Sequence, residues 1–184
     1  MPIDTNLNGP SGRALDELFL KPLGLNRNTV WLCDLLPYSR VNENQRKAIN
    51  DNYTSDIILK YNLNPPTIPL FDKKELNSPT RRTEILQEFE TSKSETIIFL
   101  GDLPIYWFLR FFDKRYSRLA QFGDTLGTYG KSHEIRINSK FYNVIPLCHP
   151  RQADRLGASN TKWGTLHDSW VYKRNSQIVK IGKM

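Results

Sequence analysis

The stretch FYNVIPLCHPR, residues 141–151, contains an apolar run that stops abruptly at a histidine followed by a proline. Short apolar runs rich in β-branched and aromatic residues are typical of buried strands. Two earlier stretches have the same character: TVWLCDLL at 29–36, and ETIIFL at 95–100, which leads directly into Gly101. We therefore predict a buried strand in each of the three places, and each ends at residues that could carry chemistry.

The segments between these strands favour helices. Apolar residues recur at helical spacing in 13–20, 44–61, 83–91 and 105–112, and 151–172 is expected to be partly helical. A hairpin that turns at Asn138 and Ser139 is expected over 133–147. Residues 62–80 contain four prolines and are expected to form a loop. Strands alternating with helices predict an α/β fold: a three-layer α/β/α sandwich with a short, mostly parallel central sheet, formed as one domain by residues 1–184.

The apolar residues of the expected strands should supply the core. This core is expected to include Val30, Leu32, Ile97, Ile98, Phe99, Val144 and Ile145. The aromatic segment 105–112 could be taken for a base-stacking platform, but crowded apolar side chains on one helix more often belong to a core. We therefore assign Trp107, Phe108, Phe111 and Phe112 to the core as well.

The composition is that of an ordinary folded protein, with 39% hydrophobic and 24% charged residues. No apolar run approaches the roughly 20 residues that a membrane span needs, and the N-terminus lacks the pattern of a signal peptide. We expect a cytoplasmic protein without a membrane partner. Cys33 and Cys148 have no metal-type spacing, so we expect reduced thiols, no metal site and no cofactor.

The net charge of +7 favours a polyanionic partner. A basic surface of this kind is the electrostatic signature of nucleic-acid binding, although many basic proteins bind no nucleic acid.

Three polar segments follow the expected strands: Asp34, Gly101-Asp102 and His149. In parallel sheets, ligands bind beyond the carboxyl ends of the strands. For Gly101-Asp102 we favour a tight turn and a helix N-cap. Asp34 alone could equally be a cap or turn residue. For His149 we favour a functional role, because the proline after it fixes the backbone and Arg151 adds a charge beside it.

The order of the motifs resembles the uracil-DNA glycosylase superfamily, most closely its iron–sulphur branch. The matching stretches are GPSG at 9–12 before a Leu-containing helix, GLNRNTVWLCD at 24–34, IIFLG at 97–101 and PLCHPR at 146–151. Together they span nearly the whole chain in the family's order. The resemblance implies an α/β/α fold and an enzyme that hydrolyses the N-glycosidic bond of a base in DNA.

The resemblance also implies roles for individual residues. Such enzymes flip the target nucleotide out of the duplex, and His149 would donate a hydrogen bond to the base, stabilising the charge that develops as it leaves. The turn residues Ser11 and Gly12 would contact DNA. Arg151, Arg155 and Lys162 would contact phosphates, although Lys162 could equally lie on an ordinary solvated helix.

The N-terminus departs from the family's pattern. The family's first motif positions the attacking water, and here only Asp4, Asn6 or Asn8 could replace it, with Asp4 favoured by its charge; a tail without this function is the alternative. Leu7 and Asn8 stand near the place of the family's base-stacking Phe. Two cysteines are too few for an iron–sulphur cluster, and Arg151 replaces the serine after His-Pro.

Asp34 replaces the asparagine that pairs with uracil in the resembled branch. An ionised carboxylate can only accept hydrogen bonds, so it would repel O4 of uracil but accept from the N4 amine of cytosine. Because excision of ordinary cytosine would destroy the host's own DNA, we expect a modified cytosine, such as the hydroxymethylated or glucosylated base of some phage genomes. An antiviral role would follow.

Two other functions remain open. The protein could be a plain uracil-DNA glycosylase in base-excision repair, or a catalytically inactive relative that binds DNA. In each case we expect a monomer. Tyr38, Trp163 and Trp170 are candidates for flanking the pocket or the DNA.

Overall fold

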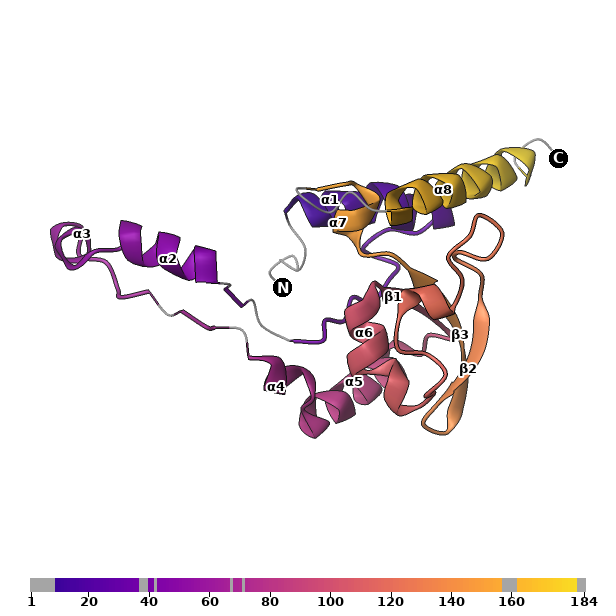
Figure 1. Ribbon diagram of the computed structural model, residues 1–184, viewed down its shortest axis with the longest axis horizontal. Coiled ribbons are helices and arrows are strands. Elements are labelled where there is room, and N and C mark those ends of the chain that lie inside the picture. Colours follow the sequence, from indigo (N-terminus) through magenta and orange to yellow (C-terminus); the bar gives the residue numbers. More distant parts are fainter. Residues whose placement is uncertain are drawn as a thin grey trace. The chain divides into compact units, whose positions relative to one another are not determined.

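The computed structural model describes residues 9–36, 40–41, 43–66, 68–70, 72–156 and 162–181 (Figure 1). The chain divides into two compact units, one formed by 1–33 with 86–184 and the other by 34–85. The second unit is thus an insertion in the sequence of the first. Among the described residues, no helix is both long and apolar enough to cross a membrane.

The first unit contains a three-stranded sheet in the order β1-β3-β2. Strand β1 (Thr96–Leu100) runs parallel to β3 (Lys140–Leu147), with Leu100 opposite Leu147, and β2 (His133–Ile137) pairs with β3 in the antiparallel sense. The expected hairpin therefore forms, and Asn138 supplies the positive φ (56°) of its turn. The prediction of an α/β fold is confirmed, but the sheet is mixed because the hairpin adds its antiparallel pair.

One face of the sheet is covered by aromatic residues of the first unit. Helix α6 (Asp102–Trp107) and the single 3₁₀ turn Leu109–Phe111 follow β1 directly. Phe108 is buried and packs against Phe99 of β1 and Phe89 of α5 (Pro79–Ser92). The core prediction holds for Phe99, Val144 and Phe108, while Trp107, Phe112, Ile97, Ile98 and Ile145 are half-buried. It is wrong for Phe111, which is 45% exposed because the turn at Phe108 ends the helix and redirects the chain.

A second layer of helices lies beyond the carboxyl ends of β1 and β3. Helix α1 (Pro10–Leu15) continues through a π-helical turn (Asp16–Leu20) and a 3₁₀ turn (Lys21–Leu23) to Gly24, whose φ of 69° ends it. Helix α1 packs on α7 (Pro150–Ala153), and α7 packs on α8 (Lys162–Ile181), as Figure 1 shows. The buried residues of this layer include Leu15, Phe19, Leu20, Ala153, Leu166 and Trp170.

The strand predicted at 29–36 does not form. Residues 26–29 are instead a turn, in which the Asn26 side chain accepts the backbone N–H of Asn28 (2.9 Å) and the Thr29 hydroxyl accepts that of Asn26 (3.0 Å). No described strand pairs with the segment that follows, so Trp31 is 54% exposed, Cys33 is exposed, and Val30 and Leu32 are only half-buried. Its apolar composition resembles that of a strand, but none of the described strands completes its hydrogen bonds.

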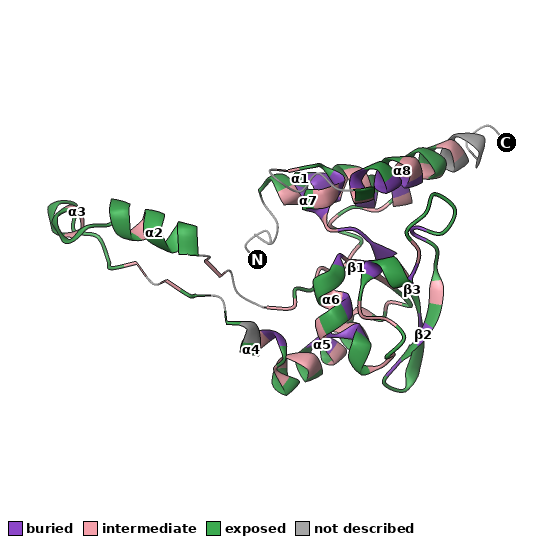
Figure 2. Ribbon diagram, in the orientation of Figure 1, coloured by how far each residue is buried: buried purple, intermediate pink, exposed green. Residues whose placement is uncertain are grey.

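The second unit consists of short helices. The single helix predicted at 44–61 is two, α2 (Glu43–Asn52) and α3 (Ser55–Lys60), because the Thr54 hydroxyl caps α3 by accepting the backbone N–H of Ile57. Helix α4 (Lys73–Leu76) lies within the expected loop, capped by the Asp72 carboxylate. An ion pair joins Arg40 to Glu75 (2.8 Å). Helix α2 has no buried residue, as its colour in Figure 2 indicates.

Candidate functional site

His149 occupies the turn between β3 and α7. Its backbone is extended (φ −66°, ψ 144°) and Pro150 begins the helix, so His149 is the N-cap. Its Nδ1 atom accepts the backbone N–H of Arg151 (3.1 Å), and its own backbone N–H donates to the side-chain oxygen of Gln152 (3.2 Å). These reciprocal bonds fix the imidazole ring in one orientation.

The hydrogen bond to Nδ1 determines which protonation state of His149 is favoured. A ring nitrogen that accepts a hydrogen bond carries no proton, so the neutral ring has its proton on Nε2. Burial and the charge of Arg151 both lower the pKa of His149, which favours this neutral form. No described residue hydrogen-bonds to Nε2. His149 therefore presents a fixed, neutral N–H donor.

Gly101 supports His149 from the neighbouring strand. Its backbone N–H donates to the Leu147 oxygen (2.8 Å), which extends the parallel pairing by one residue. Its φ is +87°, and a Cβ atom there would lie 3.1 Å from the Cβ of His149. Both the positive φ and the close approach require glycine. The structure thus brings together two of the three strand-end segments, Gly101-Asp102 and His149.

The role expected for Asp102 is different in detail. Gly101, not Asp102, is the N-cap of α6. The Asp102 carboxylate instead accepts the backbone N–H of Leu119 (2.7 Å), at the start of the 3₁₀ turn Leu119–Gln121. It therefore ties the start of α6 to a segment far along the chain.

A buried hydrogen-bond chain, which the sequence did not reveal, lies directly behind His149. The backbone N–H of Cys148 donates to the Tyr129 hydroxyl (2.9 Å), which lies 2.8 Å from Nδ1 of His167. Nε2 of His167 lies 2.9 Å from the Leu18 oxygen. One proton arrangement satisfies every group: Tyr129 donates to Nδ1, and Nε2 carries the proton that is donated to Leu18.

His167 is the central member of this chain. It is fully buried between the rings of Phe19 and Trp170, with ring centroids 4.1 and 5.2 Å away. Burial lowers its pKa to about 4 and raises the pKa of Tyr129, so both groups are neutral at pH 7. The signal in the sequence was the spacing of 163, 166, 167 and 170, which places these residues on one face of a helix. Trp170, expected to flank the pocket or the DNA, is instead buried; Trp163 is half-buried.

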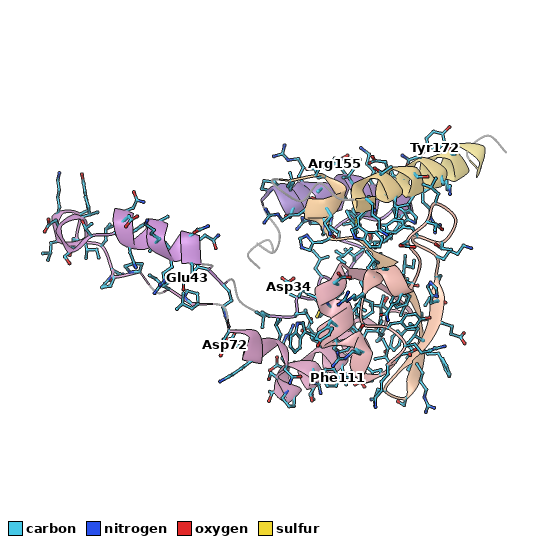
Figure 3. All side chains as sticks on the ribbon, in the orientation of Figure 1. Asp34, Glu43, Asp72, Phe111, Arg155 and Tyr172 are labelled. Atoms are coloured by element: carbon cyan, nitrogen blue, oxygen red, sulfur yellow. The ribbon has the colours of Figure 1, made fainter. Side chains whose placement is uncertain are left out.

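The three basic residues expected to contact phosphates differ in their surroundings. Arg151 is exposed, and no described acidic residue pairs with it. Arg155, labelled in Figure 3, pairs with Asp168, and Lys162 pairs with Asp124. Ser11 is half-buried and Gly12 buried on α1, which packs beside α7. Only Arg151 of the three cations can thus approach a phosphate without first leaving an acidic partner.

Asp34 begins the second unit, whereas His149 belongs to the first. Asp34 is exposed, and its backbone oxygen and that of Leu35 accept hydrogen bonds from the Arg81 guanidinium (2.5 and 3.2 Å). It does not follow a strand, contrary to the prediction. The other expected site residues, Asp4, Asn6, Leu7, Asn8 and Tyr38, lie outside the described residues.

The described part of the first unit has two surface hollows, and His149 lines neither of them. One of about 450 Å³ lies beside the π-helical turn and is lined by Asp16, Glu17, Leu20, Lys21 and 25–28. The other, of about 230 Å³, lies at the opposite end of β3, around Lys140 and Phe141. Within the described ranges, no group of three or more His, Cys, Asp or Glu residues could hold a metal ion.

Comparisons of the chain with protein-family models, with curated proteins and with solved structures found no match.

Proposed function

We propose that the protein is a DNA glycosylase that flips a modified base out of DNA and hydrolyses its N-glycosidic bond, leaving an abasic site. The observation that carries the proposal is the neutral Nε2–H of His149, held by Arg151 and Gln152 beyond the parallel pair β1 and β3. The carboxyl end of parallel strands is where ligands bind in α/β folds. On this proposal, the fold is a small version of the superfamily's three-layer sandwich.

The chemistry requires a donor rather than a general acid. As the bond to the sugar breaks, negative charge develops on the departing base. A neutral N–H hydrogen-bonded to a base oxygen strengthens its interaction as this charge grows, and so stabilises the transition state more than the ground state. His149 suits this role, because its lowered pKa keeps the ring neutral while Nε2 remains a donor.

Water must attack the sugar from the other side. In this proposal, Asp4, Asn6 or Asn8 holds that water, and Leu7 and Tyr38 lie against the base. The DNA partner is held through its phosphates by Arg151, with Arg155 and Lys162 joining after release from their acidic partners. The first unit carries 18 of the 26 Lys and Arg residues but only 12 of the 19 Asp and Glu residues, so the excess charge lies with His149.

The substrate proposed is a modified cytosine. Asp34 is the base-reading residue on this proposal, since an ionised carboxylate accepts from an N4 amine and repels O4 of uracil. The protein would act as a monomer in the cytoplasm, on modified DNA such as that of phages.

The test is incubation of the protein with matched duplexes containing uracil, cytosine, hydroxymethylcytosine or its glucosylated form. Alkaline cleavage or mass spectrometry then reports abasic sites. We expect abasic sites at modified cytosine with the wild type and very few with His149→Asn. A matched control is His133→Asn, because His133 is a half-buried histidine on β2. Release of uracil alone would indicate a uracil-DNA glycosylase, and binding without release an inactive relative.

A further inference from the structure

Helix α6 has an exposed face that its packing does not use. Ile105 is fully buried, as are Phe108 and Leu109 just after the helix. Leu103 and Tyr106, by contrast, are 57% and 37% exposed. Because residues three apart are neighbours on a helix surface, they form one apolar strip.

A cation lies over one ring of this strip. The Arg110 guanidinium is 4.2 Å from the centroid of the Tyr106 ring, at cation–π distance. Trp107 meets the same ring edge-on, with centroids 5.0 Å apart, which holds the tyrosine in place. No described acidic residue pairs with Arg110. Tyr106 and Arg110 thus offer two planar groups in contact at the surface, and Phe111, labelled in Figure 3, lies exposed on the 3₁₀ turn with Arg110.

The surroundings of this strip carry an excess of positive charge. Residues 102–118 contain four basic and two acidic residues. Both acidic residues are engaged, because Asp113 pairs with Arg115 (2.7 Å) and Asp102 accepts the backbone N–H of Leu119. In the described chain, Arg110, Lys114 and Arg118 have no acidic partner. An apolar and aromatic strip edged with cations matches a partner that has flat apolar faces and negative charge.

We propose that Leu103, Tyr106 and Arg110, the α6 platform, stack against unpaired bases of a single DNA strand, while Lys114 and Arg118 neutralise its phosphates. Aromatic rings and guanidinium planes accept any base, since every base has a π-face. The platform begins two residues after Gly101, which lies against His149. With a helical rise of about 1.5 Å per residue, Tyr106 lies about 8 Å along α6 from Gly101. If the protein is a glycosylase, as proposed above, the platform would hold the strand beside the extruded nucleotide. Binding of a single strand by the platform does not depend on that activity.

The test is fluorescence anisotropy with a labelled single strand of about 15 nucleotides without a modified base. Tyr106→Ala should weaken binding about tenfold, whereas Tyr106→Phe, which keeps the ring, should bind like the wild type. Lys114→Gln, which removes a proposed phosphate contact, should weaken binding and lower the slope of log affinity against log salt by about 0.7.

The chain offers a matched control pair. Phe141 on β3 and Arg136 on β2 are exposed and face each other across the hairpin. Phe141 stands at the opposite end of β3 from Leu147, about 20 Å away at about 3.3 Å per strand residue. Phe141→Ala and Arg136→Gln should leave binding of the strand unchanged.

Three results would overturn the platform: no binding of the single strand by the wild type, Tyr106→Ala binding within about twofold of the wild type, or an equal loss in Phe141→Ala. Sedimentation provides a fourth, because a wild-type dimer that Leu103→Ala dissociates would mean that a second copy covers this face. Since the binding assay involves no excision, the two proposals fail separately. A protein that binds through Tyr106 but releases no base disproves only the glycosylase, and one that releases a base while Tyr106→Ala binds normally disproves only the platform.

Discussion

The Tyr129 hydroxyl joins the backbone of Cys148, the residue before His149, to the buried ring of His167, with distances of 2.9 and 2.8 Å. The end of β3 is thereby anchored to α8, and through Leu18 to the first helical segment. Each of these buried polar groups has a partner, as burial requires. The position of His149 depends on this interior as well as on its own capping bonds.

His149→Asn separates the proposed chemistry of His149 from its role as a helix cap. Asparagine is a good N-cap, so the variant should keep the stability of the wild type, whereas His149→Ala should lose about 1 kcal/mol. Both variants lack the Nε2 donor. Loss of one such donor costs about 2.7–4 kcal/mol in the transition state, so excision should slow about a hundredfold to a thousandfold.

The measurements for the His149 variants are single-turnover excision, DNA affinity and urea unfolding. DNA affinity should change little, because the lost interaction strengthens only in the transition state. An Asn variant as active as the wild type would leave His149 with a structural role alone.

Removing a basic residue and removing the acidic partner of a basic residue should change DNA affinity in opposite directions. Arg151→Ala should weaken binding to all DNA sequences and lower the salt slope by about 0.9, the value for one phosphate contact. Asp168→Asn should strengthen binding, because it frees Arg155 to reach a phosphate. Asp124→Asn should act in the same way through Lys162.

These effects can be measured as affinity for a random duplex at several salt concentrations. If Asp168→Asn left the affinity and its salt slope unchanged, Arg155 would not be a phosphate contact.

Asp34→Asn tests the proposed choice of base. Asparagine can donate to O4 and accept from N3–H, so the variant should lose activity on modified cytosine and gain activity on uracil. A polar group that loses its water against the bound base without gaining a partner costs about 1–3 kcal/mol, so the ratio of the two activities should shift about tenfold or more. Excision rates on matched duplexes measure this ratio. A wild type that prefers uracil, or a ratio that does not move, would exclude Asp34 as the base-reading residue.

The sequence predicted the strands that pair with a strand next to them in the chain or with another apolar strand. The hairpin 133–147 and strand 95–100 formed because alternation and apolar runs there meet a neighbouring strand. The stretch 29–36 has a similar composition but no described strand beside it, and composition alone cannot supply that information. The break between α2 and α3 was also missed, because it depends on one hydroxyl, that of Thr54.

The candidate site was predictable in part. Gly101 and His149 were expected to meet because the carboxyl ends of parallel strands share one edge of a sheet. The partners of Tyr129, Arg155 and Lys162 lie 38, 13 and 38 residues away along the chain, and all three pairs form only once α8 has packed in the folded protein. The spacing of 163, 166, 167 and 170 places His167 on the apolar face of a helix, but it does not show which groups hydrogen-bond to the ring.

The buried ring of His167 predicts how stability depends on pH. Burial lowers its pKa from 6.5 to about 4 in the folded protein, so between these values the unfolded chain binds more protons than the folded one. Stability should therefore be full above pH 6.5 and fall as the pH decreases towards 4. A shift of this size corresponds to about 3 kcal/mol, at about 1.4 kcal/mol per pKa unit. The pKa values of His133 and His149 are also lowered, so they act in the same direction.

The measurement is urea unfolding between pH 7.5 and 4.5, with His167→Phe as the comparison. The variant should be less stable at pH 7.5, because the Tyr129 hydroxyl and the Leu18 oxygen lose their partner. Its stability should nevertheless fall less steeply with acid, because the largest proton uptake on unfolding has been removed. Loss of the hydrogen bonds of His167 changes the free energy of unfolding by the same amount at every pH. The slope of this free energy against pH therefore reports the titration of His167 alone. Parallel curves for the two proteins would mean that His167 titrates normally in the folded state, and so is not held in the buried chain behind His149.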